Sequence, residues 1–292
     1  TNDLWGVSFT DANTGTAVGG GGTILRTTNS GTNWISQSSG TTKFLNNVSF
    51  TDANTGTAVG VSGTILRTTN GGTNWILQTS GTTNDLRGVS FTNVNIGTAV
   101  GEYGTILRST NGGVNWTLQS GAVNSLCGVS FTDANTGTAV GEGGIILRTT
   151  NGGTNWTSQT SGTTNELRGV SFTDANNGTV VGSGGKILRT TNGGTFVNQK
   201  SSEIPKGFTL YQNYPNPFNP TTNIRFEVPR TSLVKLIVYD ILGREVATLV
   251  NEKLGAGSYE VDWSGSGYPS GVYFYRLETE EFIGVKKMIL IK

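Results

Sequence analysis

Apolar residues alternate with small or polar residues in short runs along the first 200 positions. The third unit of this pattern, residues 86–122, contains four such runs, at 87–91, 97–101, 105–109 and 115–119. A period of two is typical of β-strands with one buried face, and no apolar stripe with helical spacing accompanies it. Glycine-containing triplets such as 102–104 separate the runs and have the composition of tight turns. The pattern therefore predicts four short strands.

The same unit recurs with a nearly fixed period. Its first strand ends at a phenylalanine that returns in steps of 41, 41, 40 and 41 residues, at Phe9, Phe50, Phe91, Phe131 and Phe172. Tryptophan keeps the same step at Trp34, Trp75, Trp116 and Trp156, and Val197 takes the fifth place. Four short strands in each repeat of this length are typical of a β-propeller blade. A solenoid is the alternative, but its strand-bearing units are commonly shorter.

We therefore predict a β-propeller of about five four-stranded blades over residues 1–199. A single blade cannot bury both of its faces, so we expect the bulky face of one sheet to pack on the small face of the next. The repeated Phe and Trp side chains are the expected main apolar anchors, each worth about 1.5–3 kcal/mol when buried. Five such units could close into a ring. Residues 1–4 match residues 83–86, so the array could also belong to a longer one.

The composition changes after residue 200. All six prolines and seven of the eight tyrosines lie beyond this point, and charged residues become more than twice as dense. We expect a linker over residues 200–207 and a second domain over 208–292. Strand-like runs alternate there with Gly/Pro turns, at 224–228, 233–239, 258–263, 272–277 and 285–291. This pattern predicts a small Ig-like β-sandwich, so the fold class is all-β.

Charge and composition exclude several functional classes. Twenty basic residues balance 19 acidic ones, which leaves no net field to attract nucleic acid or an anionic membrane. The chain has no histidine and one cysteine, Cys127, so the commonest zinc sites, His-based triads and internal disulfides are excluded. We expect no metal, no cofactor and no membrane span. The first residues contain neither a start methionine nor a signal peptide, so the sequence is interpreted as a mature product or a fragment.

One arginine recurs at the same strand position in every repeat, and a closed ring would place the five in a circle: Arg26, Arg67, Arg108, Arg148 and Arg189. One interpretation pairs them at the surface with the recurring aspartates Asp11, Asp52, Asp133 and Asp174, which contributes little to stability. The other is a patch that binds anions or carboxylates, since Arg contacts such groups bidentately. The sequence leaves both open.

The turns between the second and third strands differ between repeats. Variable tips on a repeated scaffold commonly carry specificity, so Glu102, Tyr103 and Glu142 are candidate partner-binding residues. The alternative is that they are solvated turn residues. Cys127 occupies a position where other repeats have Trp, Asn or Arg, and we interpret it as an incidental thiol.

Residues 68–75, Thr-Thr-Asn-Gly-Gly-Thr-Asn-Trp, resemble the Asp-box, or bacterial neuraminidase repeat. Asparagine replaces the aspartate of the box in all five copies, at Asn29, Asn70, Asn111, Asn151 and Asn192. A short polar side chain here can bond to nearby backbone, the glycines permit unusual dihedral angles, and the tryptophan can cover the hairpin. We interpret the box as structural rather than ligand-binding.

The phrase Val-Gly-x-x-Gly-x-Ile-Leu-Arg-Thr before each box is similar to the photosystem II assembly-factor-like repeat family, itself an Asp-box propeller. WD repeats fit less well, because a chain without histidine lacks their Gly-His dipeptide. Asp-boxes also occur in sialidases, but glycoside cleavage ordinarily requires two placed carboxylates, or a tyrosine nucleophile with a carboxylate partner. Few residues break the repeat symmetry in that way. We expect no enzymatic activity and no catalytic residues.

The phrases of the second domain closely resemble the type IX secretion C-terminal sorting domain, and also the Ig-like domain of flagellar hook-capping proteins. The residues that carry this resemblance are Pro215, Asn216, Pro217, Phe218, Gly243, Arg244, Gly271, Val272 and Tyr273. It implies export through the outer membrane of a Gram-negative cell and contact with the secretion machinery. An ordinary Ig-like spacer is the alternative.

Together these features predict a secreted or cell-surface propeller that binds an extracellular protein or glycan. An assembly or stability factor is the alternative, as the repeat resemblance implies. A sialidase-like hydrolase is a third possibility that few residues support.

Overall fold

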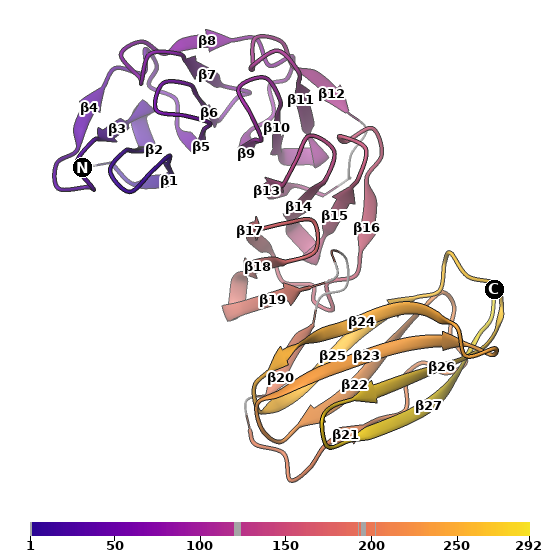
Figure 1. The fold of residues 1–292 in the computed structure, drawn as a ribbon. Helices are drawn as coiled ribbons and strands as arrows, with labels where there is room; N and C mark the ends of the chain where they lie inside the picture. Colours follow the sequence, from indigo (N-terminus) through magenta and orange to yellow (C-terminus); the bar gives the residue numbers. More distant parts are fainter. Residues whose placement is uncertain (1, 120–123, 192, 194–196, 202) are drawn as a thin grey trace. The chain divides into compact units, whose positions relative to one another are not determined.

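The computed structural model describes residues 2–119, 124–191, 193, 197–201 and 203–292 (Figure 1). Its contacts divide the chain into two compact units. The first comprises residues 1–158 and 166–171, and the second comprises residues 159–165 and 172–292. Each unit is almost entirely β-structure, which confirms the predicted fold class.

Each of the first four repeats forms a four-stranded antiparallel sheet in chain order. The first strands are β1 (Leu4–Phe9), β5 (Leu45–Phe50), β9 (Leu86–Phe91) and β13 (Leu126–Phe131). The second strands are β2 (Gly15–Gly19), β6 (Gly56–Gly60), β10 (Gly97–Gly101) and β14 (Gly137–Gly141). The third are β3 (Ile24–Thr27), β7 (Ile65–Thr68), β11 (Ile106–Ser109) and β15 (Ile146–Thr149). The fourth are β4 (Ile35–Gln37), β8 (Ile76–Gln78), β12 (Thr117–Gln119) and β16 (Thr157–Gln159).

Within the first unit these sheets are arranged as propeller blades. The strands β1, β5, β9 and β13 lie side by side along the inner edge, and the fourth strands form the outer edge (Figure 1). A serine on each of the strands β1, β5 and β9 accepts a hydrogen bond from the phenylalanine N–H of the next blade, as Ser8 does from Phe50 at 3.1 Å and Ser49 from Phe91 at 3.2 Å. The small residues that alternate with large ones thus face the following blade. This confirms the stacking predicted from the repeat.

In the first, third, fourth and fifth repeats the turn between the second and third strands is a short 3₁₀ segment: η1 (Gly20–Gly22), η2 (Glu102–Gly104), η3 (Glu142–Gly144) and η4 (Ser183–Gly185). Their central residue has a positive φ, which glycine adopts readily and other residues rarely adopt. Tyr103 adopts it as well, with φ 52°. The tight turns predicted from composition are therefore present, and Tyr103 is held at a tip where 75% of its surface is exposed.

The core between blades is aliphatic rather than aromatic. Val18 and Ile24 of the first blade pack on Leu45, Val48 and Leu66 of the second, and all five are at most 4% exposed. The same arrangement recurs between the second and third blades and between the third and fourth. The prediction that Phe and Trp are the main anchors is therefore wrong: most of them flank this core as edge-to-face pairs at its margin.

The first blade shows how much this burial depends on a neighbour. Leu4 and Val7 are 48% and 60% exposed, whereas their counterparts Leu45 and Val48 are at most 4% exposed. The sequences are alike, so the difference comes from the small face of the preceding sheet and not from the blade itself. Stacking, rather than strand pairing alone, supplies the hydrophobic stabilisation.

The fifth repeat departs from the predicted four strands. Among its described residues the sheet has three strands, β17 (Leu167–Phe172), β18 (Gly178–Gly182) and β19 (Lys186–Thr190). Val197 makes one antiparallel bridge to Arg189, and the chain then enters β20 (Asn198–Ser201), which pairs with a strand of the C-terminal sheet. Residues 200 and 201, predicted to begin the linker, thus belong to a strand. Closure of the five sheets into a ring stays a prediction.

The C-terminal part is a sandwich of two sheets with a shared core. The first sheet has the order β20, β25 (Gly257–Ser264), β22 (Thr221–Val228) and β21 (Thr209–Leu210). The second has the order β24 (Glu245–Leu254), β23 (Ser232–Asp240), β26 (Gly271–Glu278) and β27 (Ile283–Leu290). Five of these strands were predicted from alternation. The strand β24 was missed because two register shifts interrupt its alternation, so that the consecutive residues Leu249 and Val250 are both buried.

Candidate functional site

The Asp-boxes are hydrogen-bonded turns. In the second copy the Asn70 Oδ1 accepts the N–H of Asn74 at 3.0 Å, and the Thr68 hydroxyl accepts the N–H of Gly72 at 2.9 Å. Asn29, Asn111 and Asn151 make the equivalent bond. An amide oxygen therefore performs the accepting function of the box without a carboxylate, which supports the structural interpretation. Asn192 lies outside the described residues.

The box tryptophans differ in their surroundings. Trp75 is 9% exposed and its indole N–H donates to Gln37 of the preceding blade at 3.4 Å, whereas Trp34 of the first blade is 37% exposed. Trp116 donates to the Gly113 carbonyl at 3.0 Å, and Trp156 packs against the neighbouring core. Trp116 thus covers its own hairpin, as predicted, and Trp34 lines an apolar pocket of about 460 Å³ together with Trp5.

The recurring arginines join neighbouring blades. Arg26 donates to the Thr16 hydroxyl at 2.7 Å within its blade and to the Ala53 carbonyl of the next, with its guanidinium 4.9 Å from the Phe50 ring centroid. Arg108 repeats this arrangement two interfaces further on, with Thr98, Ala134 and Phe131. Cation–π contact and charge-assisted hydrogen bonds together stabilise each interface.

This geometry corrects both predicted roles for Arg26 and Arg108. Each is 8% exposed, and burial lowers the pKa of both guanidinium groups. They are neither solvated surface pairs nor donors available to an anion from solution. Arg67 also crosses to the next blade, where it donates to the Gly112 carbonyl. Arg148 is half-buried and donates to Thr138 at 3.0 Å, and Arg189 is exposed on β19.

The recurring aspartates close turns instead of pairing with arginine. The Asp52 Oδ1 accepts the N–H groups of Asn54 at 2.7 Å and Thr55 at 2.9 Å. Asp133 accepts the equivalent two N–H groups two repeats later, and Asn93 does so in the repeat between them. These hydrogen bonds hold the pKa of Asp52 and Asp133 below the ordinary value. The largest cause is the backbone N–H of Asn54 for Asp52 and that of Asn135 for Asp133.

These lowered pKa values predict an acid-sensitive contribution to stability. A carboxylate with a lowered folded-state pKa stabilises the fold above its unfolded pKa, about 3.9, and loses that contribution as pH falls through the folded value. The double variant Asp52→Asn, Asp133→Asn should keep its melting temperature at pH 7, because Asn93 shows that asparagine closes the turn. Its melting temperature should fall less than that of the natural protein between pH 5 and about pH 2.5. Calorimetric scans of both proteins at pH 5 and at about pH 2.5 test this prediction. An identical fall in melting temperature for the two proteins would contradict it.

A second set of equivalent positions carries unlike residues. Trp5, Asn46, Arg87 and Cys127 are the second residues of the first four inner strands, and at each one the pairing register with the second strand skips a residue. Bulged residues of this kind are re-aimed out of the regular pleat. We call these four residues the bulge row. The fold holds them in place without requiring a particular side chain.

Arg87 is the charged centre of the bulge row. It forms ion pairs with Glu102 of η2 at 2.8 Å and with Glu142 of η3 at 3.0 Å. Burial by itself lowers the pKa of Arg87, but hydrogen bonds to Cys127, Glu142 and Glu102 outweigh it, so the pKa lies above the ordinary value. The structure thus brings together two of the three predicted contact residues around an arginine that the prediction had missed. Tyr103 stands exposed on the turn that carries Glu102.

Cys127 continues this network. Its Sγ lies 3.7 Å from Arg87 Nη1 and 3.5 Å from Glu166 Oε1, and Glu166 forms an ion pair with Arg168 at 2.8 Å. Burial raises the pKa of the Cys127 thiol, which keeps it protonated at neutral pH. A protonated, half-buried thiol is a poor nucleophile. This supports the interpretation of Cys127 as unreactive.

The other end of the bulge row is aromatic. The exposed rings of Trp5 and Phe44 meet edge to face, with centroids 5.2 Å apart. Asn46 lies between this pair and Arg87, and its amide donates to the Leu86 carbonyl of the next inner strand at 2.8 Å. Along the inner strands the row therefore passes from an apolar aromatic pair to a charged cluster.

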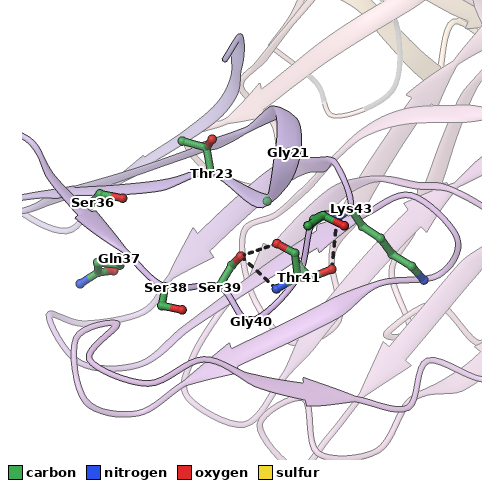
Figure 2. Close-up of a pocket in the computed structure, with 11 residues that line it drawn as sticks. Gly21, Thr23, Ser36, Gln37, Ser38, Ser39, Gly40, Thr41 and Lys43 are labelled. Atoms are coloured by element: carbon green, nitrogen blue, oxygen red, sulfur yellow. Dashed lines mark hydrogen bonds between the residues drawn. The ribbon is translucent and has the colours of Figure 1, made fainter. Parts of the chain in front are cut away.

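Two polar grooves lie beside turns that join second and third strands. The first has a volume of about 670 Å³ between η1 and residues 36–43, and Figure 2 shows its hydroxyl and amide side chains. The second, of about 710 Å³, is lined by the equivalent residues 62–64 and 77–83 of the next blade. Lys43 lines both grooves. In the first, Ser39 and Thr41 are bonded to each other, so the wall is preformed (Figure 2).

Other site types receive no support in the described part of the chain. No group of three or more Cys, Asp or Glu residues is arranged to hold a metal ion among the described residues. None of the helical segments in those residues has the length and apolar character that a bilayer crossing needs.

The predicted sorting residues mostly build the C-terminal sandwich. Phe218 is 1% exposed and packs against Trp263, and Tyr273 is 4% exposed and donates to the Pro269 carbonyl at 2.8 Å. Asn216 accepts the N–H of Ile289 at 3.0 Å, which fixes the segment of Pro215 and Pro217 against β27. Gly271 and Val272 begin β26, and Gly243 and Arg244 complete the turn between β23 and β24. Five of the nine are nevertheless exposed: Pro215, Pro217, Gly243, Arg244 and Gly271.

The chain matches two known family models. The family model described as photosynthesis system II assembly factor YCF48 matches residues 32–120, 76–162 and 117–201, which together exceed half of the chain. The chain belongs to this family. A second model, described as a secretion system C-terminal sorting domain, matches residues 212–292 of this YCF48-family member. No curated protein matches it.

Solved structures support the fold of this YCF48-family protein. A structure of YCF48 bound to D1 peptide is similar at 19% identity and TM-score 0.57, covering 100% of this chain and 94% of that one. YCF48 from Cyanidioschyzon merolae is similar at 17% identity and TM-score 0.52, covering 98% and 95%. PorZ, a surface component of the type IX secretion system of Porphyromonas gingivalis, is similar at 12% identity and TM-score 0.50, covering 99% and 45%.

These matches confirm the predicted repeat family and the C-terminal sorting domain. The sorting domain makes the chain a secreted or cell-surface protein that interacts with the type IX secretion machinery. Sequence reasoning missed Arg87 and Asn46, because a position that carries Trp, Asn, Arg and Cys in the first four repeats was interpreted as unconstrained. The departure from the repeat was itself the signal.

Proposed function

We propose that this protein is an exported binding module whose propeller recognises an extended polypeptide along the bulge row. The observation that carries the proposal is the row itself. Four equivalent, structurally held positions bear four different side chains, while the residues around them repeat almost unchanged. A repeated scaffold with varied tips is a common basis of specific recognition.

The chemistry of the row suits a peptide. Trp5 and Phe44 offer an apolar surface for one side chain, and the Arg87 cluster offers donors and acceptors for another. The neighbouring grooves present hydroxyl, amide and ammonium groups to backbone or polar side chains. The fold neighbour YCF48, seen bound to D1 peptide, supports a peptide over a glycan.

The family match favours one alternative, a factor that assists assembly of a larger complex. Export by the sorting domain argues for a role outside the cell. We also propose that the protein is not an enzyme. Glu102 and Glu142 both form ion pairs with Arg87, so they are not two separate carboxylates placed on either side of a substrate bond.

Panning a phage-displayed library of random peptides on the full chain tests the proposed function. Trp5→Ala and Arg87→Ala should each raise the dissociation constant of the enriched peptides at least about tenfold, as expected for central aromatic and arginine contacts. Ile76→Ala is the matched control, since Ile76 is 63% exposed on the outer strand β8, and its affinity should stay within about twofold. Enrichment of no peptide, or equal binding by all three variants, would refute the proposal.

A further inference from the structure

The sorting domain presents a rigid apolar tip that its fold does not use. Ile241 and Leu242 lie between β23 and β24 and are 71% and 73% exposed. Neither belongs to the core of the sandwich. The motif residues Phe218 and Tyr273, in contrast, are buried in that core and are not accessible to a partner.

The turn holds this tip in one conformation. The Asp240 Oδ1 accepts the N–H groups of Leu242 at 2.9 Å and Arg244 at 3.0 Å, and its Oδ2 accepts from Arg244 Nε at 2.7 Å. Backbone hydrogen bonds also join residues 240 and 244 and residues 243 and 240, and Gly243 adopts a φ of 75°. A preorganised turn loses little entropy when a partner binds it.

We propose that Ile241 and Leu242 are the part of the sorting domain that an apolar pocket of the secretion machinery binds. Two adjacent aliphatic side chains, exposed on a braced hairpin tip, are suited to burial in an apolar pocket. Arg244, 73% exposed beside them, can meet an acceptor at the rim of the pocket. The partner is the machinery because the domain that carries the tip is a sorting domain.

The proposal assigns different jobs to different motif residues. Phe218, Tyr273 and Asn216 build the sandwich, and the tip is the recognised element. This assignment is independent of the proposed peptide-binding function, since the bulge row belongs to the other unit of the chain.

Export of the full chain from a bacterium with a type IX system tests the tip. The double variant Ile241→Asp, Leu242→Asp should lower the ratio of extracellular to periplasmic protein at least about tenfold, because charge in an apolar pocket removes the contribution of both side chains. Its melting temperature should be unchanged, since both side chains are exposed. The milder double variant Ile241→Ala, Leu242→Ala should also lower this ratio.

Matched controls make the test specific. Leu233→Asp lies at the other end of β23 and Ile283→Asp lies on β27, where these residues are 47% and 66% exposed. Both controls should be exported like the natural protein. Normal export of the double variant at the tip would overturn the proposal, and so would an equal loss of export in the two controls.

Discussion

The variant Gly101→Ala should lower the melting temperature of the repeats by about 10 °C. A Cβ at residue 101 would lie 2.0 Å from the Asp85 carbonyl oxygen and 3.0 Å from the Leu86 Cα. Both are backbone atoms of the inner strand, so the strand itself must shift. Overpacking of this kind costs about 3 kcal/mol, which corresponds to about 6–12 °C for a unit of this size. The backbone at Gly101 is extended, so the cost is steric and not conformational.

The matched control is Gly20→Ala, at the position that follows the equivalent glycine of the first blade. Its nearest neighbours would lie 3.7 Å from the added Cβ, which is ordinary contact. Other repeats carry valine or glutamate there, at Val61 and Glu102. This variant should change the melting temperature by less than about 2 °C. Tryptophan fluorescence suits the measurement, because five of the six tryptophans lie in the repeats. Equal melting temperatures for both variants would contradict the packing described for the inner strands.

Much of the fold follows from local pattern. Alternation along residues 86–91 and 97–101 predicts the two inner strands, because one face of each is buried against a neighbouring blade. The Asp-box could be interpreted correctly as well, since the bonds of Asn70 are made within a few residues of it. Features of this kind depend on short-range geometry that sequence spacing represents well.

Features that depend on three-dimensional register could not be predicted in this way. The arginines repeat with the blades, but only packing shows that Arg26 reaches Ala53 of the next blade rather than Asp11 of its own. Arg87 meets Glu142, 55 residues away, because two bulged inner strands lie side by side. The strand β24 escaped because its bulges break the alternation on which the prediction relied.

The second large effect concerns the bulge row. Five substitutions make the row uniform: Trp5→Asn, Arg87→Asn, Cys127→Asn, Glu102→Gly and Glu142→Gly. Each one introduces the residue that another repeat of the chain has at the equivalent position, and we call the result the chain with the uniform row. Asn46 shows that asparagine is accommodated at this bulge, where its amide bonds to the next inner strand. Gly20 shows the same for glycine at the start of the 3₁₀ turn. This chain should therefore fold with a melting temperature within about 3 °C of the natural one.

Binding should respond quite differently. The substitutions remove an aromatic side chain and the whole Arg87 cluster, and each such contact at the centre of an interface is worth about 2 kcal/mol or more. The peptides enriched by panning should bind this chain at least about 100-fold more weakly than the natural one.

The most direct test measures the dissociation constant of those peptides by calorimetry, on the natural chain and on the chain with the uniform row. It tests the claim that the repeats supply the scaffold and that the residues which differ between repeats supply recognition. The account predicts melting temperatures within about 3 °C of each other and a loss of affinity of at least about 100-fold. Equal affinity, or unfolding of the chain with the uniform row, would contradict it.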